Sequence, residues 1–151
     1  MTETLTPTRR KPWNVLLVED NPGDVRFICD AFQAIQAPVR IDVVGDGEEA
    51  MAYLRHEGTH VESRTPDLVL LDLNLPLMSG REVLASAKED PALKHVPILV
   101  LSGSTNEDDV RRAYDLHANS YITKPMKLTA FRDIARHIAE FWLETASLPA
   151  P

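Results

Sequence analysis

Side chains able to take part in phosphate chemistry stand directly after the apolar runs of this sequence. Asp72, for example, follows Leu68–Leu71, four apolar residues in a row. A run of this kind predicts a strand buried on both faces of a parallel sheet, and the carboxyl end of such a strand is where open α/β sheets bind their ligands. The residues in equivalent places are two further acids, a hydroxyl and an amine: Glu19, Asp20, Ser102 and Lys124.

Together these residue types suit phosphoryl transfer to a carboxylate. Three clustered acids repel one another and need a cation, and hard oxygen ligands favour Mg²⁺. Asp72 would then attack an anionic phosphoryl donor, while Lys124 contributes a second positive charge and Ser102 a hydrogen bond. Taken singly, each residue has an ordinary explanation: an Asp or Ser in a turn, an acid at a helix start, a solvated lysine. Because several strand ends carry residues suited to the same reaction, a shared functional site is favoured over these separate explanations.

The periodicity of the remaining chain predicts the elements that position these residues. Helices are expected, each after a strand, over 22–36, 48–56, 81–89, 106–117 and 127–145. The strands are expected over 14–18, 41–44, 68–71, 97–101 and 120–123. Strict alternation predicts an α/β fold, a doubly wound five-stranded parallel sheet in the order 2-1-3-4-5 with five helices. That order brings the candidate residues to one crevice at the edge of the sheet.

Length and composition predict one domain over residues 13–146, with 1–12 lacking fixed structure and 147–151 forming a tail. The net charge of −7 among 151 residues argues against nucleic acid as a partner, since phosphate contacts need clustered Lys and Arg. No apolar run is long enough to span a membrane, so no membrane partner is expected. The single cysteine, Cys29, sits at a helical core spacing as a buried thiol and is typical of a reducing, cytoplasmic location.

Several motifs resemble the receiver domain of bacterial two-component response regulators, a flavodoxin-like fold. The matching segments surround the candidate residues: Val18–Asp20, Asp72 with Pro76 and Gly80 after it, Leu101–Gly103 and Tyr121–Pro125. The resemblance implies that a sensor histidine kinase donates a phosphoryl group to Asp72 in a phosphorelay. It also implies a signalling domain that catalyses only its own phosphorylation and dephosphorylation, and is otherwise not an enzyme.

The same resemblance implies roles for the other residues. Mg²⁺ would be held by Asp20, Asp72 and the backbone carbonyl of Asn74, with Glu19 helping through water. Lys124 would contact the phosphoryl group, and a cis peptide bond would precede Pro125. Ser102 and Tyr121 would form a switch, in which the phosphoryl group draws the hydroxyl toward it and the aromatic ring turns inward.

A narrower resemblance is to single-domain regulators paired with phytochrome-type, light-sensing kinases. It rests on Val18–Asp24, Ala113–His117 and the ending Phe141–Leu143 with Leu148 and Pro149. Apolar residues at this ending, spread over a wider arc than one sheet face covers, also predict a homodimer through residues 106–146.

Two other functions share parts of the pattern. A phosphatase of the haloacid-dehalogenase type also forms an aspartyl-phosphate, but it needs an acid/base Asp two residues after the nucleophile, where this chain has Asn74. A nucleotide- or flavin-binding module shares the topology, yet no Gly-rich loop follows the first strand, and Glu19 and Asp20 there would repel a phosphate.

Overall fold

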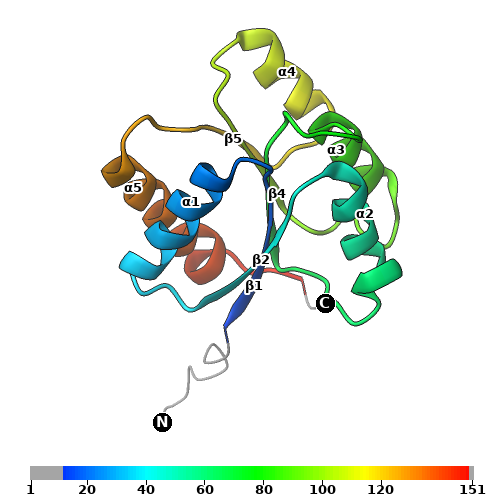
Figure 1. Cartoon of the computed structure of the whole chain (residues 1–151), viewed down its shortest axis with the longest axis horizontal. Coiled ribbons are helices and arrows are strands. Elements are labelled where there is room, and N and C mark those ends of the chain that lie inside the picture. Colours follow the sequence, from blue (N-terminus) through cyan, green and yellow to red (C-terminus); the bar gives the residue numbers. More distant parts are fainter. Residues whose placement is uncertain (1–11, 150–151) are drawn as a thin grey trace.

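The fold is a single parallel sheet covered by helices on both faces, seen in a computed structural model that describes residues 12–149 (Figure 1). The sheet order is β2-β1-β3-β4-β5, so the predicted order and fold class are confirmed. The strands, in chain order, are β1 Trp13–Val18, β2 Val39–Val44, β3 Leu68–Leu71, β4 Ile98–Ser102 and β5 Ser120–Thr123.

The helices divide between the two faces. Helices α1 and α5 cover one face, and α2, α3 and α4 cover the other (Figure 1). Two short turns of other helix types complete the chain, η3 Gly58–His60 in the polar loop after α2 and η4 Ala139–Thr145 at the end of α5. The α-helices are α1 Pro22–Ala34, α2 Gly47–Arg55, α3 Gly80–Glu89, α4 Glu107–Asp115 and α5 Leu128–Ile138.

Alternate residues of the central strands feed two separate apolar cores. In β3, Val69 and Leu71 pack under α2 and α3, whereas Leu68 and Leu70 pack under α1 and α5. All four residues are fully buried, because β3 is paired with β1 on one side and β4 on the other. The end of this strand is therefore held rigidly from both faces and both edges, which fixes the backbone that carries Asp72.

Several helix starts follow the expected chemistry. The Asn21 side chain accepts a hydrogen bond from the backbone N–H of Asp24 at 3.1 Å, and Pro22 occupies the first turn of α1. The Asn106 side chain likewise accepts from the backbone N–H of Asp108 at 2.7 Å, at the start of α4. These caps set where α1 and α4 leave the carboxyl edge of the sheet.

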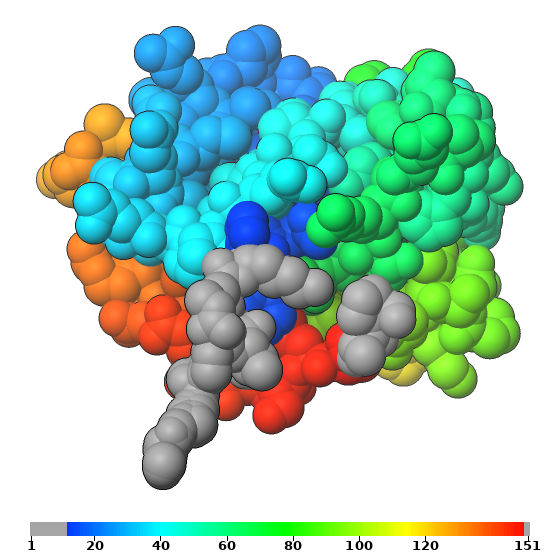
Figure 2. All heavy atoms as spheres, turned by 90° about the horizontal axis from the view of Figure 1, so that it is seen from below, coloured from blue at the N-terminus to red at the C-terminus, as the bar shows by residue number. Residues whose placement is uncertain are grey.

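The last predicted helix, over 127–145, is continuous but changes type. After Ile138 it becomes the π-helix η4, closed by a hydrogen bond from the Ala146 N–H to the Phe141 carbonyl at 2.7 Å. The wider turn resets which side chains face the sheet. Leu143 is buried, so the expectation that it adds free apolar surface is wrong, whereas Trp142 is only partly buried against the core beneath α1 and α5. Viewed from below, η4 lies beside the start of β1 (Figure 2).

The expected cis peptide bond before Pro125 is also wrong, because every peptide bond between residues 12 and 149 is trans. Trans is the lower-energy form even before proline, by about 0.5–1 kcal/mol.

Cys29, expected to be buried, is half-buried on α1. The predicted unstructured segment 1–12, apart from Pro12, and the last two residues of the predicted tail 147–151 lie outside the described residues. Between residues 12 and 149, no helix has the length and apolar character needed to cross a bilayer.

Candidate functional site

The two acids that end the central strands are buried at the carboxyl edge of the sheet. The backbone N–H of Asp72 donates to the Val18 carbonyl at 3.0 Å, which continues the pairing of β3 with β1. The backbone N–H of Glu19 donates to the Val44 carbonyl at 3.0 Å, continuing the pairing of β1 with β2. Strand geometry thus carries both side chains to the same edge, where Asp72 is 6% exposed and Glu19 2% exposed.

Carboxylate oxygens of Glu19, Asp20 and Asp72 lie within 4.8 Å of one another. Asp20 is exposed, so the cluster opens to solvent on one side. Backbone N–H groups orient the two buried acids: that of Asn74 donates to Asp72 Oδ1 at 3.2 Å, and that of Asn21 donates to Glu19 Oε2 at 3.2 Å. Three clustered carboxylates, two of them buried, form the kind of oxygen-rich site that hard divalent cations bind. The structure therefore brings together the acids that the sequence predicts as metal ligands.

Lys124 lies in the middle of the acids. Its Nζ is 2.7 Å from Glu19 Oε1, 2.8 Å from Asp24 Oδ2 and 3.5 Å from Asp72 Oδ2. The lysine is held there because its backbone N–H donates to the Ser102 carbonyl at 2.7 Å, which extends the pairing of β5 with β4. Asp24 is a contact that the sequence pattern does not reveal, because a helix cap at Asn21 already accounts for an acid three residues later.

Burial and neighbouring charges shift the pKa of two groups in this cluster. Burial raises the pKa of Glu19 to about 7, with a contribution from the nearby Asp72 charge, although the hydrogen bond from Lys124 acts in the opposite direction. Burial alone would lower the pKa of Lys124, but its hydrogen bonds to Asp24 and Glu19 outweigh this and raise it. The ammonium therefore stays charged, whereas Glu19 holds its proton more tightly than an ordinary glutamate.

The backbone around Asp72 leaves room for only a glycine at position 80. A Cβ atom on Gly80 would lie 2.3 Å from the Asp72 carbonyl oxygen and 2.5 Å from the Leu73 Cα. Helix α3 can therefore begin directly against the segment that carries Asp72 only because Gly80 has no side chain. The eight-residue spacing between Asp72 and Gly80 is in this way a packing requirement of the site.

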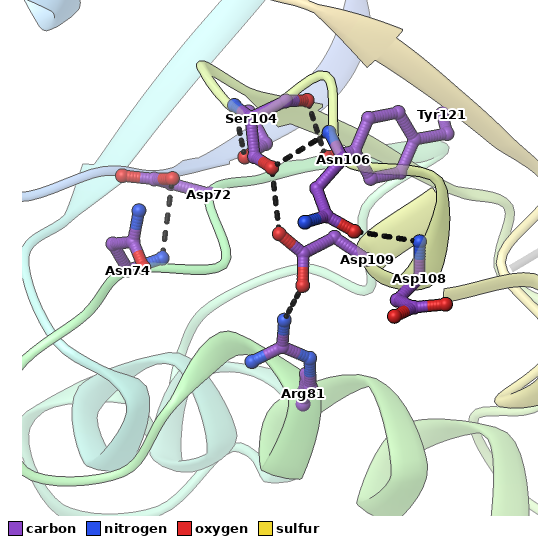
Figure 3. A network of polar contacts seen from close by, with 9 residues as sticks. Asp72, Asn74, Arg81, Ser104, Asn106, Asp108, Asp109 and Tyr121 are labelled. Carbon is purple, nitrogen blue, oxygen red and sulfur yellow. Dashed lines mark hydrogen bonds and ion pairs between the residues drawn. The ribbon is translucent and has the colours of Figure 1, made fainter. Parts of the chain in front are cut away.

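The two predicted switch residues are joined through Ser104, which the sequence did not indicate. Ser102 is 1% exposed, and its Oγ accepts a hydrogen bond from the Ser104 N–H at 3.2 Å. Tyr121 is half-buried with its ring against the core beneath α2, α3 and α4, and its hydroxyl donates to the Ser104 carbonyl at 2.8 Å (Figure 3). No hydrogen bond within residues 12–149 joins Ser102 to Asp72 directly.

A parallel 2-1-3-4-5 sheet with an acidic cluster and a lysine at its carboxyl edge defines a receiver domain, and the sequence agrees. Residues 15–136 match the response regulator receiver domain family, and the chain belongs to this family. The chain is therefore a member of a signalling family.

Individual relatives are described more specifically than the family as a whole. Response regulator Rcp1 from Synechocystis is 44% identical over 139 residues, which cover 92% of this chain and 95% of Rcp1. The crystal structure of phosphorylated RcpA, a cyanobacterial phytochrome response regulator, has a TM-score of 0.87 and 52% identity, covering 92% of this chain and 99% of RcpA. The bacteriophytochrome response regulator AtBRR has a TM-score of 0.74 and 33% identity, covering 93% of this chain and 99% of AtBRR.

Proposed function

We propose that Asp72 accepts a phosphoryl group from a sensor histidine kinase. The observation that carries this proposal is the position of the Asp72 carboxylate, which lies at the end of a rigid buried strand, beside an acidic cluster and 3.5 Å from the Lys124 ammonium. In the transfer, an Asp72 oxygen forms a bond to phosphorus as the bond between phosphorus and the kinase histidine nitrogen breaks. Lys124 balances the growing negative charge, and the Ser102 hydroxyl donates a hydrogen bond to a phosphoryl oxygen.

The residues present fit a magnesium ion as the metal of this site. Asp20 and Asp72 would ligate it together with the backbone carbonyl of Asn74, and Glu19 would contribute through water. When bound, the ion neutralises charge between Asp72 and the incoming phosphoryl group. A solved structure of Rcp1 in its Mn²⁺-bound form, with a TM-score of 0.85 and 44% identity, supports a divalent cation in this chain too; that match covers 92% of this chain and 100% of Rcp1.

The kinase in this proposal is of the phytochrome type. The support is the set of relatives, because RcpA and AtBRR are both phytochrome or bacteriophytochrome response regulators. Domain boundaries of 13–146, a cytoplasmic location and the absence of any catalysis beyond the chain's own phosphorylation belong to the same proposal.

A homodimer through residues 106–146 is also part of the proposal, on a smaller apolar surface than the sequence suggested. Phe141 is 53% exposed and Tyr114 on α4 is 48% exposed. The ring of Phe141 packs edge-on against that of Trp142, with centroids 5.3 Å apart.

Light scattering tests the dimer. It should show a dimer for the wild-type chain and for Phe27→Glu on α1, but a monomer for Phe141→Glu. A monomeric wild-type chain at high micromolar concentration would contradict the dimer.

The phosphoacceptor is tested with acetyl phosphate and Mg²⁺. The wild-type chain should take up one acid-stable, base-labile phosphoryl group per molecule, and Asp72→Asn should take up none. Asp30→Asn, which changes an exposed carboxylate on α1, is the matched control and should be labelled like the wild type. Equal labelling of Asp72→Asn would refute the assignment. Continuous release of phosphate would indicate a phosphatase, and no reaction at all would favour a nucleotide- or flavin-binding module.

A further inference from the structure

A second polar network lies beside the candidate site, centred on Ser104 in the loop between β4 and α4 (Figure 3). Ser104 Oγ donates to Asp109 Oδ2 at 2.6 Å and accepts from the Asn106 N–H at 3.2 Å. The main chain of Ser104 contacts both predicted switch residues, through its N–H to Ser102 and its carbonyl to Tyr121. Every polar group of this one residue is therefore engaged.

Asp109 connects this loop to a neighbouring helix. Its other oxygen, Oδ1, is 2.6 Å from Nη2 of Arg81, which stands in the first turn of α3. A charged pair with good hydrogen-bond geometry is roughly twice as strong as a neutral one. The Arg81 Nε is buried and has no hydrogen-bond partner in the described part of the chain, so the contact with Asp109 is the one polar contact that the structure gives this guanidinium.

Ser104 is hydrogen-bonded to both predicted switch residues. The Tyr121 hydroxyl is bonded to the Ser104 carbonyl while its ring is packed inward, so a loop that holds Ser104 in place also favours the inward ring. The Ser102 hydroxyl oxygen accepts a hydrogen bond from the Ser104 N–H. The hydroxyl hydrogen of Ser102 is therefore free to donate to a phosphoryl oxygen.

We propose that Arg81 and Asp109 are positioning residues that fasten Ser104, and through it hold Tyr121 inward and Ser102 ready for the phosphoryl group. The proposal rests on the proposed function of Asp72. Neither residue touches the phosphoryl site itself. Their effect is on the free-energy difference between the two arrangements of the loop, so a phosphoryl group that selects the inward arrangement binds more tightly while the Arg81–Asp109 pair is intact.

The first test follows Tyr121 without any phosphoryl ligand. The chain is labelled with 3-fluorotyrosine, and its three tyrosines give separate ¹⁹F NMR signals, of which Tyr121→Phe identifies one. Asp109→Asn and Arg81→Gln should both move this signal toward the shift of an exposed tyrosine. Arg81→Lys, which keeps the charge, should restore part of the shift. Asp133→Asn is the matched control, because it removes an exposed Arg136–Asp133 pair at 3.0 Å on α5 and should leave the signal unchanged.

The second test measures the affinity for beryllofluoride, a phosphoryl mimic, in the presence of Mg²⁺. Asp109→Asn and Arg81→Gln should each weaken binding about fivefold, and the double variant should be no weaker than either one, because the pair acts as a unit. Asp133→Asn should bind like the wild type.

The results separate this proposal from the function on which it rests. A wild-type chain that binds no beryllofluoride would overturn the phosphoacceptor function, while the ¹⁹F signal would still report whether the pair positions Tyr121. An unmoved Tyr121 signal in Asp109→Asn and Arg81→Gln would overturn the proposal whatever the affinity. A moved signal with unchanged or tighter mimic binding would overturn it as well.

Discussion

The two polar networks at the carboxyl edge of the sheet differ in charge balance. Around Lys124, four carboxylates surround a single ammonium, three of them as ion pairs and the fourth through the acidic cluster. Around Ser104, one carboxylate, Asp109, meets one guanidinium, Arg81. The first network carries excess negative charge and is completed by a cation, whereas the second is balanced by itself. The difference suggests that chemistry is concentrated in the first and positioning in the second.

The networks also differ in exposure. The side chains of Lys124 and Glu19 are 13% and 1% exposed, whereas those of Arg81 and Asp109 are 34% and 29% exposed. Breaking a buried pair leaves an uncompensated charge away from water, while breaking a partly exposed pair lets water replace the lost partner. Mutations in the two networks should therefore differ clearly in their cost.

The largest effect is expected for Lys124→Met in the absence of metal. Removing the ammonium leaves Glu19 and its neighbouring acids without their cation, which should lower the free energy of unfolding by on the order of 3 kcal/mol. Urea denaturation measures this change. Lys127→Met replaces an exposed lysine that makes no side-chain cap bond and should change the stability little. Equal stability of the two variants would mean that the Lys124 ammonium does not stabilise the clustered acids.

The metal-free protein should also lose stability as the pH rises. The pKa of Glu19 is raised in the folded state, from its ordinary 4.5 to about 7, so the folded chain holds this proton more tightly than the unfolded chain does. The stabilisation is complete below pH 4.5 and is lost as the pH rises through about 7, and a rise in pKa of this size corresponds to a loss of roughly 3 kcal/mol. Urea denaturation between pH 4.5 and 8 should show this slope, and Glu19→Gln should remove it. An unchanged slope in that variant would assign it to another group.

A smaller effect is expected from magnesium. At ten times its dissociation constant, an ion that binds only the folded state adds about 1.4 kcal/mol to the free energy of unfolding. Thermal denaturation of the wild-type chain should shift upward accordingly, and Asp20→Asn should lose most of the shift. Asp46→Asn, at the start of α2, serves as a control outside the cluster and should retain it. An Asp20→Asn variant with the full shift would remove Asp20 from the ligand set.

The smallest effect is expected in the balanced network. Asp109→Asn breaks the ion pair with Arg81, but both partners are about one-third exposed, so solvent screening should limit the cost to about 1 kcal/mol or less. Urea denaturation at neutral pH measures it against Asp133→Asn. A loss as large as that of Lys124→Met would show that the second network is a main support of the fold, and the contrast between the networks would fail.

The sequence was sufficient to predict the site residues that stand at the ends of strands. Asp72, Glu19 and Lys124 each follow a predicted strand, and the pairing of parallel strands then determines where they meet. Asp24 was missed because its spacing from Asn21 already satisfies a helix cap, so no residual signal pointed to Lys124, which is 100 positions away in the sequence.

The sequence pattern does not predict which residues of different helices come into contact. Arg81 and Asp109 are 28 residues apart, and their meeting depends on how α3 and α4 pack against the sheet. Asp109 is one of three acids in the first turn of α4, where any acid complements the helix dipole, so its position in the sequence does not indicate a partner. At the chain end, the apolar spacing is equally compatible with an α-helix, so the change to η4 could not be read from the sequence pattern.

The π-helix η4 is the segment through which the chain leaves the domain. Successive residues of an α-helix are about 100° apart around its axis, and the wider turn of η4 rotates each residue by less, so η4 accommodates an extra residue over the same total rotation. Deleting one residue between Ala139 and Thr145 would therefore favour a regular α-helix and leave the direction of the residues beyond it largely unchanged. The segment thus holds one residue more than a regular helix needs, and that residue could be removed with little change at Ala146 and beyond.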